Sequence, residues 1–372
     1  MSDTPGSAKN GKDSKPKSGA KANSAPKATA VAEQTPDATS HTATRSDGSQ
    51  SDAVPHKASA ESSSAVVAPA QTTSDTVSDR MPGADSVRLA VRKTYKLFIG
   101  GAFPRSESGR SFEVTSAQGA FLANAALGSR KDARDAVKAA RAAFGGWSGA
   151  TAYNRGQILY RIAEMLEGRR DQFVAEVSAV DGLPAEAAEA QVDAAIDRWV
   201  WYAGWSDKLS QVRGTVNPVA GPYWNVSSPE PTGVVAVFAP VRPSLLGLVS
   251  VLAPVIVSGN TAVLVAPEAA GLPAITLAEV LATSDLPGGV VNMLTGRVTE
   301  LSKPLAEHLD VDALDLTGVS DASLATEMER AGAQNLKRIR RPVPDPDWSS
   351  DPGLDRMMSF LEIKTVWHPV GV

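Results

Sequence analysis

Apolar and polar residues form a regular pattern only from about Tyr95 onward, and this pattern predicts where secondary structure begins. The stretch "YKLFIGGAFP" (95–104) contains a short apolar run that ends at two adjacent glycines, as a strand entering a tight turn does. The stretch "SFEVTS" (111–116) alternates with a period of two, which is typical of a half-buried strand. We therefore expect these two stretches to pair as a hairpin.

The next three apolar patterns have the spacing of amphipathic helices. They cover residues 129–144, 152–180 and 185–209. Ser129 and Asp132 stand at the start of the first pattern with the spacing of a capping box, and the second pattern stops near Gly182. The third pattern carries three tryptophans within 199–205. These rings could stack on nucleic-acid bases, but their positions on an amphipathic helix favour packing in the core or at an interface.

Further along, the chain alternates four times between a short apolar run and a helical pattern. The expected strands are 234–240, 262–265, 290–294 and 313–316, and the expected helices are 245–257, 273–283, 300–308 and 322–331. Strands that are apolar on both faces are typical of a parallel sheet covered by helices on both sides. The alternation therefore predicts an α/β domain with a Rossmann-like, doubly wound parallel sheet.

The first 93 residues carry no such pattern. They contain no Phe, Trp, Tyr or Ile, and their only leucine is Leu89. A segment of this composition cannot bury enough apolar surface to offset the entropy lost on ordering, so we interpret 1–93 as a disordered low-complexity tail. The beginning of this segment is rich in lysine, which is compatible with an acidic partner but fits a solvated tail better.

Composition excludes several kinds of chemistry. The chain has no cysteine, so it has no disulfide, thiolate metal ligand or thiol nucleophile. Two of its four histidines, His41 and His56, lie in the tail, which argues against a histidine metal site. The net charge of −4 argues against a nucleic-acid surface, and no apolar run reaches the ~18 residues of a membrane span. Because no N-terminal apolar signal segment follows the first methionine, we expect a soluble, cytoplasmic protein.

Several longer motifs occur in a specific order along the chain. They are "YAGWSDK", "EPTGVVAVFAP", "LAPVIVSGNTAVL", "LPGGVVNMLTG", "AEHLDVDALDLTG" and "FLEIKTVWHP". In sequence and spacing, these motifs resemble the aldehyde dehydrogenase superfamily over essentially everything after Tyr95. The resemblance implies a Rossmann-like nucleotide-binding domain, together with a small oligomerisation sheet built from the first strands (94–116) and the final strand (358–372).

The resemblance ends at the catalytic residues. In the family, the turn after a strand like "VVAVFAP" reads Pro-Trp-Asn-Phe-Pro, and the asparagine helps to hold an oxyanion; here Arg242 takes its position. An arginine could stabilise an oxyanion, but only if a nucleophile creates one, and the family's nucleophile is a cysteine. We therefore interpret Arg242 as filling or salt-bridging a site that no longer serves chemistry, and we predict no catalytic residue.

The family's general base is also missing from this sequence. It is a glutamate on a strand of the type Leu-Glu-Leu-Gly-Gly, which should follow "AGAQNLKRI". The chain continues instead with a proline-rich stretch that has no strand propensity, and it then rejoins the family pattern. The predicted organisation is a tail (1–93), a nucleotide-binding domain that includes the N-terminal oligomerisation strands (94–339), a linker that replaces the catalytic domain (340–357) and an oligomerisation strand (358–372).

The resemblance implies a nucleotide site of which only remnants are present. The family holds the adenosine ribose with a Lys-Pro-x-Glu motif, where this chain has Val265 to Glu268, so the cation is lost. The Gly-Ser-Thr turn near the pyrophosphate reads Gly318-Val319-Ser320 here. The residues that could remain from a cofactor site are Pro240, Glu268, Gly296, Gly318 and Ser320. Glycines at such turns also serve close helix–strand packing, so we expect no bound cofactor, with NAD or NADP as the alternative.

These features predict a protein without activity of its own. In the family's dimers, the oligomerisation sheet pairs with the edge of the neighbouring subunit's catalytic domain, which this chain lacks. We therefore expect a structural or regulatory subunit that binds a full-length aldehyde dehydrogenase through 358–372 and 94–116. The alternatives are an NAD(P)-dependent oxidoreductase acting on aldehydes, a nucleotide-binding or nucleotide-sensing module, and self-association through the helix that carries the tryptophans. We expect neither a membrane nor a nucleic acid as partner.

Overall fold

The computed structural model describes residues 93–371, which belong to one compact unit. The tail predicted for 1–93 therefore lies outside the described residues, except for Lys93. Within the described part of the chain, no helix combines the length and the apolar character that crossing a membrane requires. Two clusters of buried apolar residues, one on each face of a central sheet, form the core.

The central sheet has five parallel strands in the order β10-β9-β6-β7-β8. These strands are β6 (Val234–Phe238), β7 (Thr261–Ala266), β8 (Val291–Thr295), β9 (Ala313–Asp315) and β10 (Arg338–Arg340). Every residue of the first four strands is buried, because helices cover both faces. The predicted doubly wound α/β sheet is thus confirmed. β10 extends it to Arg340, where the sequence had indicated that the linker begins.

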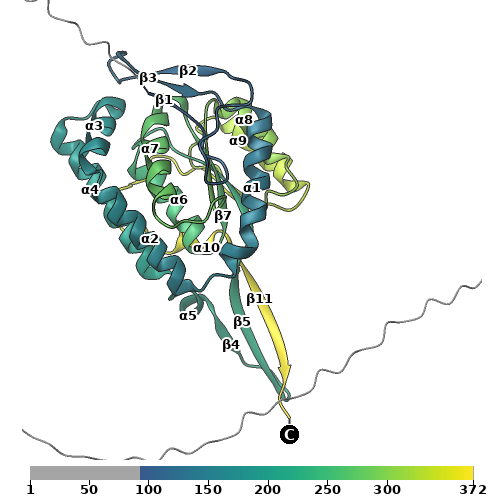
Figure 1. Cartoon of the computed structure of the whole chain (residues 1–372). Coiled ribbons are helices and arrows are strands. Elements are labelled where there is room, and N and C mark those ends of the chain that lie inside the picture. The colour runs from purple at the N-terminus through teal and green to yellow at the C-terminus, as the bar shows by residue number, and fades with distance from the viewer. Residues whose placement is uncertain (1–92, 372) are drawn as a thin grey trace, which may run out of the picture. The chain divides into compact units, whose positions relative to one another are not determined.

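Helices pack on the two faces of this sheet as two separate groups. One face carries α6 (Leu246–Val257) and α7 (Gly271–Ala282), and the other carries α1 (Arg130–Ser148), α8 (Val298–Ala306) and α9 (Ala322–Ala333) (Figure 1). The predicted capping box of α1 is confirmed. The Asp132 carboxylate accepts a hydrogen bond from the Ser129 backbone amide (2.8 Å), and the Ser129 hydroxyl oxygen accepts one from the Asp132 amide (3.3 Å).

A further group of helices consists of α2 (Ala152–Glu167), α3 (Arg170–Asp181), α4 (Ala185–Trp205) and the short α5 (Leu209–Arg213). α2 and α4 pack on α6, α3 packs on α7, and α5 lies against β5. The single helix predicted over 152–180 is wrong, because the chain leaves the helical conformation at Arg169 (φ −119°). The apolar period continues across this break because α2 and α3 both pack on α4. Gly182 ends α3 with φ +71°, as predicted, and α4 ends at Trp205 rather than at 209.

The tryptophans of α4 belong to the interior of the protein. Trp199 is completely buried, and Trp201 and Trp205 are partly buried against the same core cluster. Trp201 packs edge-on against Tyr202, with 5.0 Å between the ring centroids. The packing interpretation of this cluster is confirmed, since a completely buried Trp199 ring offers no surface for stacking on a base.

The N-terminal strands form a small sheet of their own in the order β1-β3-β2. β1 (Thr94–Tyr95) pairs in parallel with β3 (Phe121–Ala126), and β2 (Ser111–Thr115) pairs antiparallel with β3. The predicted hairpin between 95–104 and 111–116 is therefore wrong. The true partner of both stretches is rich in alanine ("FLANAA"), and alanine has little strand preference, so the pattern did not mark it as a strand.

The final strand lies in a third sheet, which extends from the body as an arm (Figure 1). β11 (Leu361–Pro369) pairs antiparallel with β5 (Tyr223–Pro231) over its whole length, and β5 also pairs with β4 (Thr215–Asn217). The predicted oligomerisation sheet is corrected accordingly. The strands within 94–116 belong to the N-terminal sheet, and the partner of the final strand is β5, which no sequence pattern had indicated.

The proline-rich segment after β10 lies against the body of the protein. We call residues 341–354 the docked linker; it has no helix or strand, and α10 (Asp355–Met358) follows it. The Arg198 guanidinium of α4 donates to the carbonyl oxygens of Trp348 (2.8 Å) and Ser350 (3.1 Å). Trp348 packs against the core cluster on that side of the sheet. The linker thus covers part of the body instead of only connecting two of its elements.

Candidate functional site

The strand order creates a crevice at the carboxyl edge of the sheet. From β6 the chain proceeds through β7 to β8 on one side, and β9 then lies on the other side of β6. Ligands of open α/β sheets bind where the order reverses in this way. All five residues predicted as remnants of a cofactor site follow the strands β6 to β9 at this edge: Pro240, Glu268, Gly296, Gly318 and Ser320. The structure therefore brings them to one side of the molecule.

The backbone amides at the start of α6 are already occupied by side chains of the protein. The Asp181 carboxylate accepts from the Ser244 amide (3.0 Å), and the Gln191 side-chain carbonyl accepts from the Leu245 amide (3.1 Å). Gln191 in turn donates to Asp181 (3.0 Å), and both residues are buried. A helix N-terminus favours an anion, and here the carboxylate of Asp181 supplies it. No sequence motif had marked either residue, although each is a polar residue within an otherwise buried helical stripe.

Arg242 lies beside this corner and is exposed. It forms no hydrogen bond or ion pair with any residue of 93–371. Of the two predicted roles, filling or salt-bridging a vacated site, the described part of the chain thus provides no partner for a salt bridge, and the first role stays a prediction. The adjacent amides cannot attract it, because they are donors and already bind Asp181 and Gln191.

Glu268 and Gly296 both have contacts inside the protein. Glu268 begins the short 3-10 helix η1 (Glu268–Ala270) and forms an ion pair with Arg297 (3.2 Å). Gly296 has φ +144°, and a Cβ atom there would lie 3.2 Å from the Gly128 amide nitrogen. The glycine is thus required by its own backbone conformation and by close packing, as the alternative interpretation stated. Arg297 was not singled out by any sequence motif.

The turn after β9 is shaped by packing against β6. The Gly318 amide donates to the Phe238 carbonyl (2.8 Å), and a Cβ atom on Gly318 would lie only 2.0 Å from the Ala239 carbonyl oxygen. Ser320 is exposed. The following helix α9 is capped by Asp321, whose carboxylate accepts from the Ser323 amide (2.8 Å). A second carboxylate of the protein therefore occupies a helix N-terminus at this edge.

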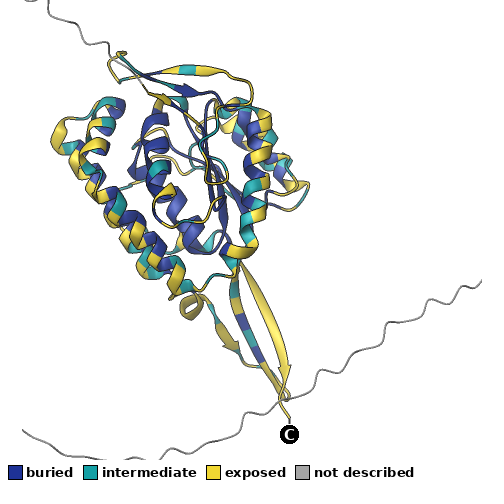
Figure 2. Cartoon of the chain, viewed as in Figure 1, coloured by how far each residue is buried: buried dark blue, intermediate teal, exposed yellow. Residues whose placement is uncertain are grey.

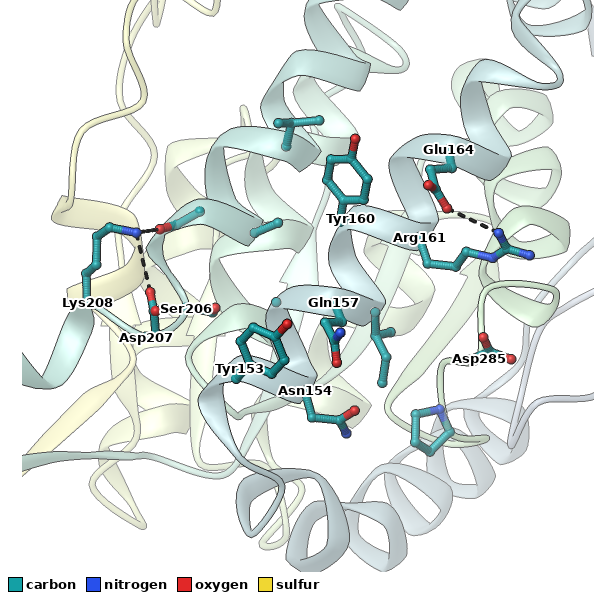
Figure 3. A pocket seen from close by; sticks show the side chains of 16 residues that line it. Tyr153, Asn154, Gln157, Tyr160, Arg161, Glu164, Ser206, Asp207, Lys208 and Asp285 are labelled. Atoms are coloured by element: carbon teal, nitrogen blue, oxygen red, sulfur yellow. Dashed lines mark hydrogen bonds and ion pairs between the residues drawn. The ribbon is translucent and has the colours of Figure 1, made fainter. Parts of the chain in front are cut away.

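A separate groove lies away from the carboxyl edge of the sheet, between α2 and α4. Its volume is about 970 Å³, and Tyr153 and Tyr160 line it (Figure 3). Its charged side chains include the ion pairs Arg161–Glu164 (3.1 Å) and Lys208–Asp207 (3.3 Å), as the dashed lines in Figure 3 mark. None of the residues predicted as remnants of a catalytic or cofactor site lines this groove.

Two kinds of catalytic group, a thiol nucleophile and a metal cluster, are absent from the described residues. The chain has no cysteine, and within 93–371 no three histidine, aspartate or glutamate side chains gather closely enough to hold a metal ion. At the carboxyl edge, the side chains that a ligand could contact are Arg242 and Ser320, which are exposed, and Glu268, which is paired with Arg297. These groups can bind, but none of them is an activated nucleophile.

Comparison with known proteins shows which family this α/β fold is similar to. Residues 103–340 match the aldehyde dehydrogenase family. The mitochondrial aldehyde dehydrogenase of Leishmania tarentolae is 34% identical over 246 residues, which are 66% of this chain and 49% of that protein. Retinal dehydrogenase 2 of Gallus gallus is 32% identical over 259 residues, covering 68% and 49%. A solved NAD+ complex of an aldehyde dehydrogenase from Bacillus cereus is similar with a TM-score of 0.63 and 27% identity, covering 66% of this chain and 50% of its own.

The match extends through the central sheet and ends at β10. The chain spans about half the length of the relatives that it matches, so it contains only a part of the fold that they have. The docked linker lies beyond the matched residues, and its predicted role as a replacement for the catalytic domain stays a prediction. Because the matched region covers more than half of the chain, the protein belongs to the aldehyde dehydrogenase family.

Proposed function

We propose that this chain is a non-catalytic structural or regulatory subunit that assembles with a full-length aldehyde dehydrogenase. The observation that carries the proposal is the arm, in which β11 pairs with β5 along one edge only. Within residues 93–371, no strand pairs with the other edge of β11. A free edge of this kind can add a strand from another chain through main-chain hydrogen bonds.

The side chains of β11 support the same proposal. After Leu361 every residue of the strand is exposed, including the apolar Ile363, Val366 and Trp367, the last of which is 58% exposed (Figure 2). Exposed apolar residues concentrated on a free strand edge are typical of an interface, because burying them on binding is favourable. The missing cysteine supports the non-catalytic part of the proposal, since the family's chemistry depends on that thiol.

The test is to purify the tagged full chain from its own cells and to measure the native mass of the complex. We expect a full-length aldehyde dehydrogenase in a fixed ratio, and we expect Trp367→Glu to release it, because a carboxylate would be buried in the interface. Tyr160→Glu is the matched control, since Tyr160 is 52% exposed on the body and outside the arm. A wild-type chain that elutes alone, or a partner that both variants retain, contradicts the proposal.

A second candidate function is binding or sensing of a dinucleotide at the carboxyl edge. The expectation that no cofactor binds has no support in the comparisons, since the Bacillus cereus relative was solved with NAD+. Dinucleotide binding is opposed by the carboxylates of Asp181 and Asp321, which already occupy the helix N-termini at this edge. Calorimetric titration of the full chain with NAD, NADP and ATP tests this function. Saturable binding would favour it, and turnover of an aldehyde by the isolated chain would revive the oxidoreductase alternative.

A further inference from the structure

Three arginines from three different elements meet under the docked linker. Arg198 comes from α4, Arg340 from the end of β10 and Arg356 from α10. Together with linker residues that include Trp348 and Ser350, they line a cavity of about 250 Å³. We call it the arginine cavity. It lies beside the carboxyl end of β9, because Arg340 is paired in register with Asp315.

The buried negative charge at this place is sufficient for only one of the three arginines. Asp315 is almost completely buried, and its Oδ2 atom lies 3.3 Å from the Arg356 guanidinium. Its Oδ1 atom accepts from the backbone amide of Thr317 (3.0 Å). Arg198 and Arg340 form no ion pair with any residue of 93–371. Two guanidinium charges, that of the buried Arg198 and that of the partly buried Arg340, are therefore left without a buried partner, and burial without one is costly.

The hydrogen bonds of these two arginines go to neutral groups. Arg198 is 8% exposed and donates to the Ser250 hydroxyl (3.0 Å) and to two linker carbonyls. Arg340 donates to the Ser359 hydroxyl (2.8 Å), while its Nε atom is buried and has no partner. The hydroxyl of Tyr202, which the three arginines influence electrostatically, is also buried without a partner. Donors are thus present in excess of acceptors around the cavity.

The carboxylates at the cavity rim are engaged elsewhere. Asp347 is exposed and accepts from the Ser349 amide (2.9 Å), and Asp351 is exposed and accepts from the Gly353 amide (2.9 Å). Burial is the largest influence on the pKa of Arg198 and lowers it, while Asp351 opposes this lowering only in part. The exposed rim carboxylates are screened by water, so they do not replace a buried anion.

We propose that the arginine cavity binds a small, doubly charged oxyanion, such as phosphate or a short dicarboxylate. Two unpaired guanidinium groups match two negative charges, and guanidinium groups bind carboxylate and phosphate oxygens through two parallel hydrogen bonds. The Trp348 ring, 5.2 Å from the Arg356 guanidinium, helps to hold that arginine in place. Arg198 and Arg340 lie within the region matched by the family, whereas the linker and Arg356 lie outside it, so residues beyond the match complete this site.

The test is calorimetric titration of the full chain with phosphate and with malonate, each at constant ionic strength with chloride as the balancing anion. We expect saturable binding of at least one dianion, and Arg340→Gln should weaken it by ~10-fold or more, because the variant loses a charged donor. Arg341→Gln is the matched control. Arg341 is the next residue, but its side chain is 76% exposed and already pairs with Glu329.

Circular dichroism checks that both variants are folded, and Arg340→Lys replaces Arg340→Gln if the latter is not. The lysine variant keeps the charge but loses the Nε donor, so it should also bind more weakly. Preference between phosphate and malonate identifies the class of anion. The absence of saturable heat with either anion overturns the proposal, and so does equal weakening by the Arg340 and Arg341 variants. Neither result depends on whether a partner enzyme binds the arm.

Discussion

Lys337 is a buried cation that links the stability of the protein to pH. Its ammonium group donates to the carbonyl oxygens of His308 (2.7 Å) and Val311 (2.6 Å), and the residue is only 7% exposed. Burial lowers the pKa of Lys337 from 10.5 to about 8, and Asp312 opposes this shift to a smaller extent. Between these two pH values, the unfolded chain keeps a proton that the folded chain has released. Stability therefore rises as the pH increases from 8 to 10.5.

Urea unfolding of the wild type and of Lys337→Met at pH 7.5 and pH 10 measures this effect. The wild type should gain on the order of 1–2 kcal/mol relative to the variant between the two pH values, since only the wild type has the shifted group. The other lysines and tyrosines titrate in both proteins and cancel in the comparison. A difference between the two proteins that is the same at both pH values would contradict the pKa shift.

Asp181 shows why the role of a single residue was difficult to predict. It precedes Gly182 at the end of α3, far along the chain from the corner whose Ser244 amide it binds. Its carboxylate reaches that amide only because α3 packs on α4 and α7, and α4 packs on α6. The position of Arg242 at the corner followed from its motif, but its lack of a partner within residues 93–371 could not, because ion pairs depend on residues brought together from elsewhere.

The start of α1 is held by a hydrogen-bond network that is larger than a capping box. The Asp132 carboxylate accepts from the Ser129 amide (2.8 Å), from the Ser106 hydroxyl (2.7 Å) and from the Glu107 amide (3.0 Å). It therefore fixes the start of the helix and the loop between β1 and β2 of the N-terminal sheet at the same time. Asp132 is buried, so its removal leaves several donors without an acceptor.

Replacement of the two capping residues should have unequal effects. Ser129→Ala should lower the free energy of unfolding by about 1 kcal/mol, the usual cost of losing a helix cap. Asp132→Ala should lower it by about 2–4 kcal/mol, because buried donors lose their acceptor. Urea denaturation measures both, with the exposed Asp135→Ala on the same helix as the control. Equal effects of the two capping variants would show that the contacts with 106 and 107 contribute nothing.

The docked linker covers part of the body of the protein and lies beyond the region that matches the family. Trp348 packs on the core, Arg198 binds two linker carbonyls, and Met357 and Phe360 are buried just after the linker. The face of the sheet that carries α6 therefore has its own cover within this chain. We therefore expect the linker to contribute to the stability of this unit.

Replacement of residues 342–353 by a Gly/Ser sequence of equal length should destabilise the whole unit. The loss of Trp348 packing and of two hydrogen bonds to Arg198 should lower the free energy of unfolding by on the order of 3 kcal/mol. Urea unfolding measures the change, and Val343→Ser, an exposed position in the same segment, serves as the control. Unchanged stability after the replacement would mean that the linker is only a tether.

The sequence by itself determined the parallel sheet, the alternating helices, the capped start at Ser129 and the absence of a thiol. These features depend on composition or on residues that are close together along the chain, so a local pattern is enough to predict them. Only the tertiary structure decided that β11 pairs with β5, that Asp181 fills the corner, and that Arg198, Arg340 and Arg356 meet around one cavity. Each of these features joins segments distant in sequence, and which segments meet is decided by the packing of the whole chain around its core.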